Sequence, residues 1–216
     1  MAVYDPVRVC NMALNRIGIT QKVVDLNDLS DHLAVTCKDW YDICRDRTLA
    51  AFTWPFATVR VPLGLVETFT AVNDPDIEWA FAYRYPVECI VARRIASGLR
   101  VEPEAVPFEL GQDATGRLIF TNQEKAILEM TGTLADPGEW PDALADAVSS
   151  ALAVELAGPL RVAMEKKASA KGDYAQALMR AQGIANNERR IGPQQVSKYI
   201  TARHGITRDS VFRRGY

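Results

Sequence analysis

The residue types that most often carry chemistry are sparse in this chain and lie far apart. There are two histidines, His32 and His204, and neither has a second metal ligand close to it in the sequence. A zinc site needs several nitrogen or sulfur ligands at characteristic spacings, which are missing here. We therefore predict no metal site and no cofactor. His32 follows Asp31 at a predicted helix start, which indicates a surface position.

Nucleophilic residues show no catalytic setting either. The four cysteines, Cys10, Cys37, Cys44 and Cys89, form no CxxC pair and stand among apolar neighbours, as is typical of buried free thiols in a reducing compartment. No GxSxG sequence is present, so no serine has a recognisable nucleophile setting. We expect no catalytic residue and a protein that is not an enzyme. A small hydrolase with a site built from scattered residues is the least favoured hypothesis.

Three short segments resemble ligand sites only weakly. Residues 111–117 are similar to half a phosphate loop, but no GK[ST] follows, and a hairpin turn is the better interpretation. The loop 73–76 offers carboxylates for calcium, but Pro75 and the missing loop glycine argue against that role. Asp142 and Asp146 are one helical turn apart, a spacing more typical of a solvated face than of an acid/base pair.

Charge is distributed unevenly along the chain. The seven basic residues and one acid from Arg189 to Tyr216 give +6, and subtracting this from the formal net charge of −2 leaves −8 for residues 1–188. After Gly192-Pro193 the chain keeps several large apolar residues without core periodicity, which a purely flexible tail rarely has. This pattern predicts a partner-binding tail. The residues expected to contact the partner are Arg189, Arg190, Lys198, Tyr199, Ile200, Arg203, Arg208, Val211, Phe212, Arg213, Arg214 and Tyr216.

Other roles for this tail stay open. It could pack on its own subunit, its basic residues could neutralise DNA phosphates, or they could pair with acidic residues of another protein subunit.

Helical patterns lie on both sides of the chain's middle. Asp5-Pro6 predicts a helix start and Gly18 its stop, and a second helix is expected over residues 31–51. From residue 141, apolar residues recur every four positions up to Gly158-Pro159, and a last helix is expected over residues 160–187. The outward face of the second helix is predicted to be a solvated surface or a subunit contact, with Lys38, Asp39, Asp42, Arg45 and Asp46.

The middle third shows strand patterns after Pro55 ends helical propagation. Phe52, Trp54 and Phe56 at this junction are interpreted as part of the core rather than as a stacking surface. Strands are predicted at residues 57–65, 79–85, 108–110, 118–121 and 125–132, with residues 86–95 a short strand or one helical turn.

These patterns predict an α+β fold that is mainly α. The expected architecture is a helical bundle core with an inserted small antiparallel β-sheet and an extended C-terminal tail. The predicted boundaries are residues 1–51 for the N-terminal core helices, 52–135 for the inserted sheet, 136–190 for the C-terminal core helices and 191–216 for the basic docking tail.

Three segments, taken in order, resemble a known family. They are VCNMALNRIG (residues 9–18), the stretch from Cys37 to Ala57 with its AFTWPFA, and WAFAYRYPVEC (residues 79–89). The pattern is similar to phage head-to-tail adaptor proteins, the type called tail tubular protein A in short-tailed phages, with related adaptors in long-tailed phages and gene transfer agents. The resemblance covers about residues 5–190. Glu88 stands where aspartate is expected, and the tail beyond Pro193 does not match.

The resemblance implies a structural protein of the virion neck. Such adaptors form a homo-oligomeric ring, usually of twelve subunits, that joins the portal protein to a downstream tail, stopper or nozzle protein. The ring continues the DNA channel without sequence-specific binding, and in several adaptor families a C-terminal segment docks on the portal. The portal or a neighbouring subunit is therefore the expected partner of the tail. The alternative is a DNA-binding or packaging accessory protein that uses the basic tail.

We expect no membrane contact, because no stretch approaches the ~18 apolar residues that a spanning helix needs. Residues 1–4 are too short and polar for a signal peptide. Assembly is expected in the host cytoplasm, with the final location in the virion.

Overall fold

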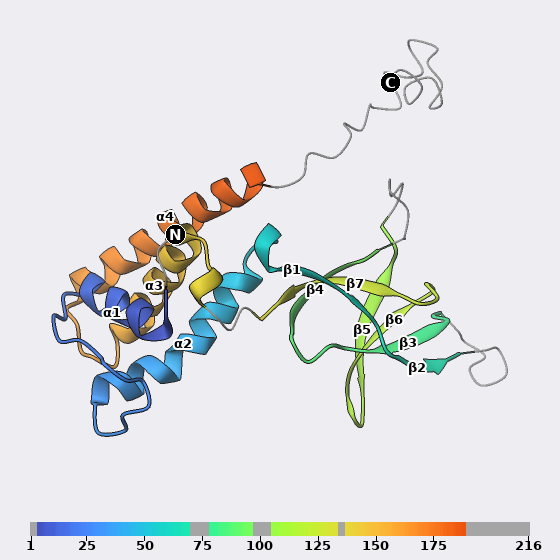
Figure 1. The fold of residues 1–216 in the computed structure, drawn as a ribbon, viewed down its shortest axis with the longest axis horizontal. Coiled ribbons are helices and arrows are strands. Elements are labelled where there is room, and N and C mark those ends of the chain that lie inside the picture. The colour runs from blue at the N-terminus through green and yellow to red at the C-terminus, as the bar shows by residue number, and fades with distance from the viewer. Residues whose placement is uncertain (1–3, 70–77, 97–104, 134–136, 189–216) are drawn as a thin grey trace, which may run out of the picture.

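The computed structural model describes residues 4–69, 78–96, 105–133 and 137–188. Helices take up 46% of these residues and strands 24%. The helices gather at one end of an elongated molecule and the strands at the other (Figure 1). The helices are α1 (Pro6–Arg16), α2 (His32–Ala50), α3 (Asp142–Leu156) and α4 (Met164–Glu188), with the 3-10 turns η1 (Pro55–Ala57) and η2 (Pro137–Glu139).

The first two helices begin at aspartate caps. The Asp5 carboxylate accepts a hydrogen bond of 2.6 Å from the backbone N–H of Arg8, and Asp31 accepts one of 2.9 Å from Leu33. These bonds satisfy N–H groups that the first turn of a helix leaves unpaired. The predicted helix starts are confirmed. The predicted stop at Gly18 is confirmed as well, and its φ of +83° lies in the left-handed region that favours glycine.

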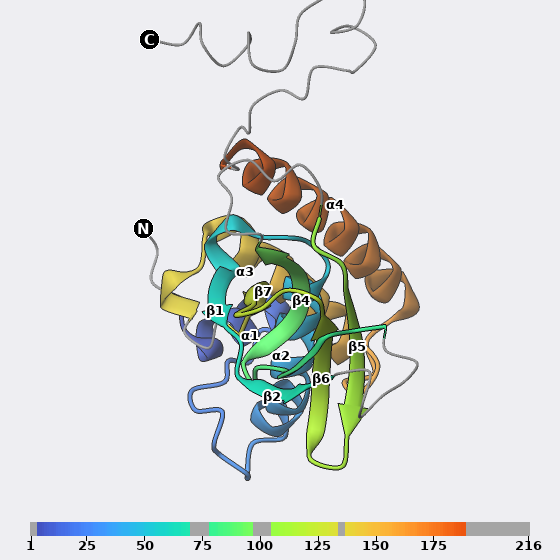
Figure 2. The same ribbon diagram turned by 90° about the vertical axis from the view of Figure 1, so that its right-hand side faces the viewer.

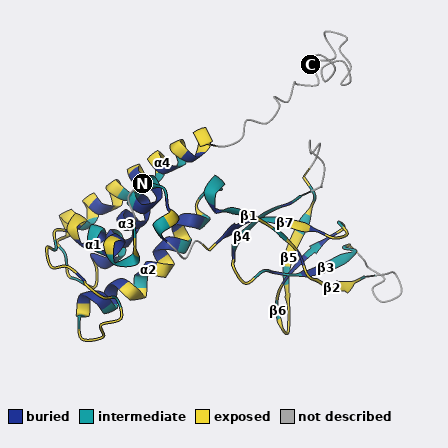
Figure 3. Ribbon diagram, in the orientation of Figure 1, coloured by how far each residue is buried: buried dark blue, intermediate teal, exposed yellow. Residues whose placement is uncertain are grey.

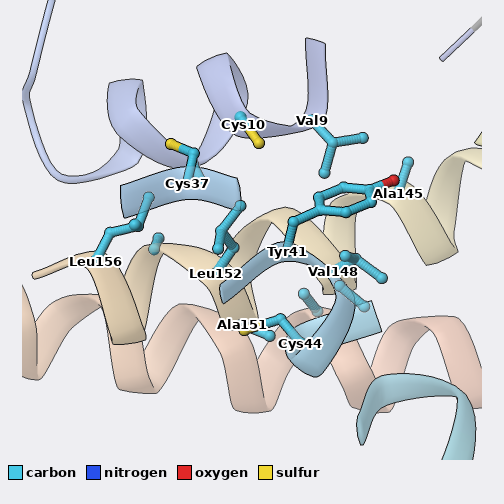
Figure 4. Close-up of a cluster of buried hydrophobic side chains, with 14 of the residues drawn as sticks. Val9, Cys10, Cys37, Tyr41, Cys44, Ala145, Val148, Ala151, Leu152 and Leu156 are labelled. Carbon is cyan, nitrogen blue, oxygen red and sulfur yellow. The ribbon is translucent and has the colours of Figure 1, made fainter. Parts of the chain in front are cut away.

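α3 is the centre of the helical part. α1, α2 and α4 all pack against it, and α2 and α4 lie on opposite sides of it (Figures 1 and 2). Figure 4 shows side chains of α1, α2 and α3 meeting in the resulting cluster, among them Cys10, Tyr41 and Leu152. α4 joins the cluster through four buried alanines, whose small side chains let the two helices approach closely. They are Ala170, Ala177, Ala181 and Ala185.

The described strands form two antiparallel sheets. One sheet has the order β1-β7-β4 and the other β2-β3-β6-β5. The strands are β1 (Thr58–Pro62), β2 (Leu65–Thr68), β3 (Phe81–Arg84), β4 (Cys89–Ala96), β5 (Phe108–Asp113), β6 (Gly116–Thr121) and β7 (Ile127–Gly132).

The two sheets meet at both margins and enclose a second core. At one margin the chain passes from β1 to β2 through Leu63, whose N–H donates to the Ala126 carbonyl at 2.9 Å. At the other margin Ile95 of β4 bridges to Val106, just before β5. Side chains from both sheets fill the space between them, separately from the helical core. They are Leu63, Tyr83, Tyr85, Cys89, Ile95, Ile119, Ala126, Leu128 and Met130.

This arrangement corrects the predicted fold class. The prediction of a mainly α protein, with a helical bundle core and a small inserted sheet, is wrong, because seven strands of the described chain form two antiparallel sheets with a hydrophobic core of their own. Periodicity detects single strands but not their partners. The pattern predicts one strand over residues 57–65, whereas the chain bends near Leu63 and pairs with both sheets. Residues 89–96 form a full strand whose register with β7 shifts twice.

Arg93 of β4 connects the sheets to the helical part. Its guanidinium donates to the carbonyl oxygens of Phe52 at 2.7 Å, Ala50 at 3.0 Å and Leu49 at 3.4 Å, and to Thr131 Oγ1 at 2.9 Å. Carbonyls at the end of a helix lack intrahelical partners, and a cation is favourable there. Partial burial lowers the pKa of Arg93. The arginine therefore completes the C-terminal end of α2 from the neighbouring sheet.

Replacing Arg93 tests this connection. Arg93→Ala removes the partners of several carbonyls at the end of α2, and hydrogen bonds to charged groups contribute ~1.5–3 kcal/mol. We expect the free energy of unfolding, measured by urea titration followed by circular dichroism, to fall by about 2 kcal/mol. Arg60→Ala is the matched control, because Arg60 is exposed and pairs with Glu129 at the surface, so its loss should stay below about 1 kcal/mol. Equal losses in the two variants would contradict a special role for Arg93.

Candidate interaction surfaces

The residues predicted to bind a partner all lie outside the described part of the structure. The described chain stops at Glu188, the last residue of α4, so the structure places the starting point of the tail and none of its contacts. The predicted residues concerned are Arg189, Arg190, Lys198, Tyr199, Ile200, Arg203, Arg208, Val211, Phe212, Arg213, Arg214 and Tyr216.

A shallow apolar groove lies beside the C-terminal end of α4. Its enclosed space of about 10 Å³ has room for a single water molecule. Small-molecule sites usually measure ~300–1,000 Å³, so the groove is too small for a substrate of that kind. It is lined by Trp54, Phe56, Pro141, Ala143, Leu144, Ala181, Ile184, Ala185 and Glu188.

The aromatic residues at the end of α2 belong to the helical core, as predicted. Trp54 is 1% exposed, and its indole N–H donates to the Thr48 carbonyl at 3.1 Å. The ring of Phe52 meets it edge-on, with the ring centroids 5.2 Å apart, and the tilted ring of Phe56 lies 5.8 Å from it. Phe52 and Phe56 are only partly buried. Trp54 therefore has no free face on which a nucleic-acid base could stack.

The weak ligand-site candidates have structural roles where the structure describes them. His32 is exposed, so its predicted surface position is confirmed. The predicted hairpin is confirmed, because β5 and β6 pair up to Asp113, whose carboxylate accepts from the N–H groups of Thr115 and Gly116. The calcium-like loop 73–76 lies outside the described residues. Within the described ranges, no cluster of His, Cys, Asp and Glu is arranged to hold a metal, and no helix combines the length and apolarity needed to cross a membrane.

The two aspartates at helical spacing in α3 are not simply a solvated face. Asp146 accepts a hydrogen bond from Arg16 of α1 and lies 3.8 Å from Arg180 of α4, so it connects three helices. Asp142 accepts from the Tyr4 hydroxyl at 3.1 Å. Periodicity placed both residues on one face but could not show which neighbours that face would meet.

The outward face of α2 differs from its prediction at one position. Lys38, Asp39 and Asp42 are exposed as expected, whereas Arg45 is buried. Its guanidinium lies 2.8 Å from the carboxylates of both Asp42 and Asp46. Arg45 therefore pairs with two aspartates of this face, while its own side chain is buried.

A ladder of three charged residues crosses the outer face of the three-stranded sheet. Glu129 in the central strand β7 accepts from Arg94 of β4 at 2.9 Å and from Arg60 of β1 at 3.0 Å. The hydrogen bond from Arg94, followed by that from Arg60, holds the pKa of Glu129 below its usual value. No pattern in the sequence indicated this ladder, because its members lie on strands whose pairing depends on the fold.

All four cysteines are buried free thiols, as predicted. A hydrogen bond shared with Cys37, together with burial, raises the pKa of Cys10. Burial raises the pKa of Cys44 to about 12. Since the thiolate is the reactive form, these two thiols are poor nucleophiles at neutral pH.

Comparison with known families and with curated proteins found no match to this chain.

Thiol labelling tests the burial of the cysteines. Because all four are buried and at least two have raised pKa values, we expect Ellman's reagent at pH 7.5 to react with the native protein at least about a hundredfold more slowly than with the protein in guanidinium chloride. In the denaturant all four thiols should be titrated. Fast labelling of any native cysteine would contradict the buried positions.

The charged ladder predicts a pH dependence of stability. Because the pKa of Glu129 is lowered by folding, its ionised form stabilises the native state above its unfolded pKa of about 4.5, and this contribution is lost as the pH falls through the lower folded value. Wild type should be more stable than Glu129→Gln at pH 7, by about 1 kcal/mol, and the difference should shrink towards pH 3. Urea titrations at both pH values measure it. A difference that stays constant with pH would argue against the ladder.

Proposed function

We propose that this chain is a structural head-to-tail adaptor of a tailed phage or phage-like particle. In this proposal copies of the chain form a ring between the portal and the tail and continue the DNA channel. The C-terminal tail docks on the portal or on a neighbouring subunit, and the chain performs no catalysis. DNA passes through the ring without being read in sequence.

The observation that carries the proposal is the set of three segments that resemble adaptor proteins. In the structure each segment occupies a position that builds the fold. The first supplies Val9 and Leu14 to the helical core, the second contains Trp54 at the end of α2, and the third supplies Tyr83 and Cys89 to the sheet core. All three segments therefore contribute buried residues to one of the two hydrophobic cores.

The elongated architecture supports the same function. The helices and the sheets have separate hydrophobic cores and lie at opposite ends of the molecule (Figure 1). A protein that connects two different structures needs two surfaces that face apart. The helical end and the sheet end meet this requirement, and the carbonyl contacts of Arg93 connect them.

Truncation of the tail tests the proposal. We expect a chain ending at Gly192 to keep its circular dichroism spectrum, because the described core ends at Glu188, and to lose binding to the portal protein of the particle that encodes it. Binding is measured by co-sedimentation, and ring formation by electron microscopy. A second variant with Lys198, Arg203, Arg213 and Arg214 replaced by glutamine separates charge pairing from apolar docking. Normal portal binding by the truncated chain would refute docking by the tail.

The full chain, tested for binding to DNA and to portal, distinguishes the adaptor from the alternative, a DNA-binding accessory protein. Phosphate contacts make DNA affinity fall steeply with salt concentration. If the full chain binds duplex DNA tightly with a steep salt dependence and shows no response to portal, the accessory function replaces the adaptor proposal. Weak, unspecific DNA binding with ring formation on portal supports the adaptor.

A further inference from the structure

The apolar groove beside the C-terminal end of α4 lies where the described chain ends. Glu188, the last described residue, lines it together with Ile184 of the same helix. Ala143 of α3 and Phe56 of η1 line it from neighbouring elements. Buried residues continue along α4 to its last turns, beside the exposed face of the helix (Figure 3). The segment that follows Glu188 therefore starts at the edge of the groove.

The groove leaves apolar surface in contact with water. Ile184 is 42% exposed, and Phe56 and Ala143 are only partly buried. Because the enclosed space holds a single water molecule, it accepts one branch of an apolar side chain rather than a free ligand. Covering this surface is favourable in proportion to the apolar area removed from water. Glu188 is the single charged residue among the described ones that line the groove.

The sequence after Glu188 contains an occupant of matching character. Gly192-Pro193 is a residue pair typical of turns, so the direction of the chain can reverse there. Residues 193–200 carry one charge, Lys198, which is opposite in sign to that of Glu188. The same residues include three large apolar side chains within five positions, which are Val196, Tyr199 and Ile200.

The length of chain between α4 and these apolar residues favours the groove of the same chain. Residues 189–195 span at most ~25 Å when fully extended, at ~3.3–3.6 Å per residue. Ile184 lies only ~6 Å before Glu188 along a helix that rises ~1.5 Å per residue. The connection is therefore long enough to turn back. It is also short enough to hold the apolar residues beside the groove at an effective concentration of the order of mM, well above that of a second copy in dilute solution.

We propose that residues 193–200 fold back over this groove in their own chain, with Val196, Tyr199 and Ile200 covering Ile184 and Phe56. The contact anchors the first part of the C-terminal tail. Residues 203–216, which carry four of the tail's arginines, stay available for an external partner and leave the body from a fixed point. The anchor itself does not depend on the proposed function, whereas the use of the remaining tail does.

Thiol protection tests the anchor in the intact chain. The native cysteines are buried, so Ile184→Cys adds one reactive thiol at the groove. Met179→Cys is the matched control, because Met179 is 64% exposed on the same helix and does not line the groove. Each variant is labelled with iodoacetamide in the full chain, in a chain ending at His204 and in a chain ending at Gly192. At position 184 the two longer chains should react about tenfold more slowly than the shortest, and at position 179 all three should react alike.

Two further variants keep the test independent of Ile184. Ala143→Cys places the thiol on α3 and should show the same protection. Replacing Tyr199 and Ile200 with serine should abolish protection at both positions. Equal labelling of position 184 in all three chains would overturn the anchor. Loss of protection in the chain ending at His204 would overturn it too, because the occupant would then be the distal tail.

Protein concentration separates the chain's own tail from that of a second copy. An intramolecular contact gives the same protection at about 1 µM and about 100 µM, because its effective concentration is set by the connection. Protection that rises over this range would assign the groove to a second copy and overturn the proposal. Portal binding is measured separately: a protected thiol in a chain that ignores portal would refute the adaptor function and leave the anchor standing. Tail-dependent portal binding with an unprotected thiol would do the reverse.

Discussion

The burial of α3 on nearly every side is the constraint on which the rest of the helical part depends. A helix that is apolar over most of its circumference cannot lie on a surface, and one neighbour covers only one stripe of it. α1, α2 and α4 therefore all pack on α3. Even its polar residues are adapted to this position, because the hydroxyls of Ser149 and Ser150 donate to the Asp146 carbonyl at 2.9 and 2.8 Å. Their polar atoms are thus paired inside the core.

The packing of three helices around α3 determines which helix faces are exposed. The helices that cover it turn their other faces outwards, and α2 and α4 do so on opposite sides. Arg93 supplies hydrogen-bond donors to the carbonyls at the end of α2. The same arginine belongs to β4, so the end of the helix and the position of the sheets are coupled. The buried core, the connection to the sheets and the two open helix faces follow from one packing arrangement.

The distribution of charge separates the body of the chain from its C-terminal segment. The body of the chain, residues 1–188, is acidic, while the C-terminal segment is basic. On the body, Arg84, Arg94 and Arg93 are held by Asp113, Glu129 and backbone carbonyls respectively, so they serve the fold.

Local patterns in the sequence determined the helices well, because capping and amphipathic spacing act within a few residues. Asp5, Gly18 and the recurrence of Leu144, Val148 and Leu152 define their elements without help from distant residues. The burial of the cysteines and of Trp54 followed from their apolar neighbours. The tail residues were identified from composition alone and lie outside the described structure.

Tertiary structure decided the strand pairing and the side-chain contacts between residues that are far apart in the chain. It divided the seven described strands between two sheets and gave them a core of their own, which overturned the predicted fold class. It buried Arg45, directed Arg93 to the end of α2 and assembled Glu129 with arginines from two other strands. Strand register and long-range packing bring these residues together, and neither is encoded in the spacing of neighbouring residues.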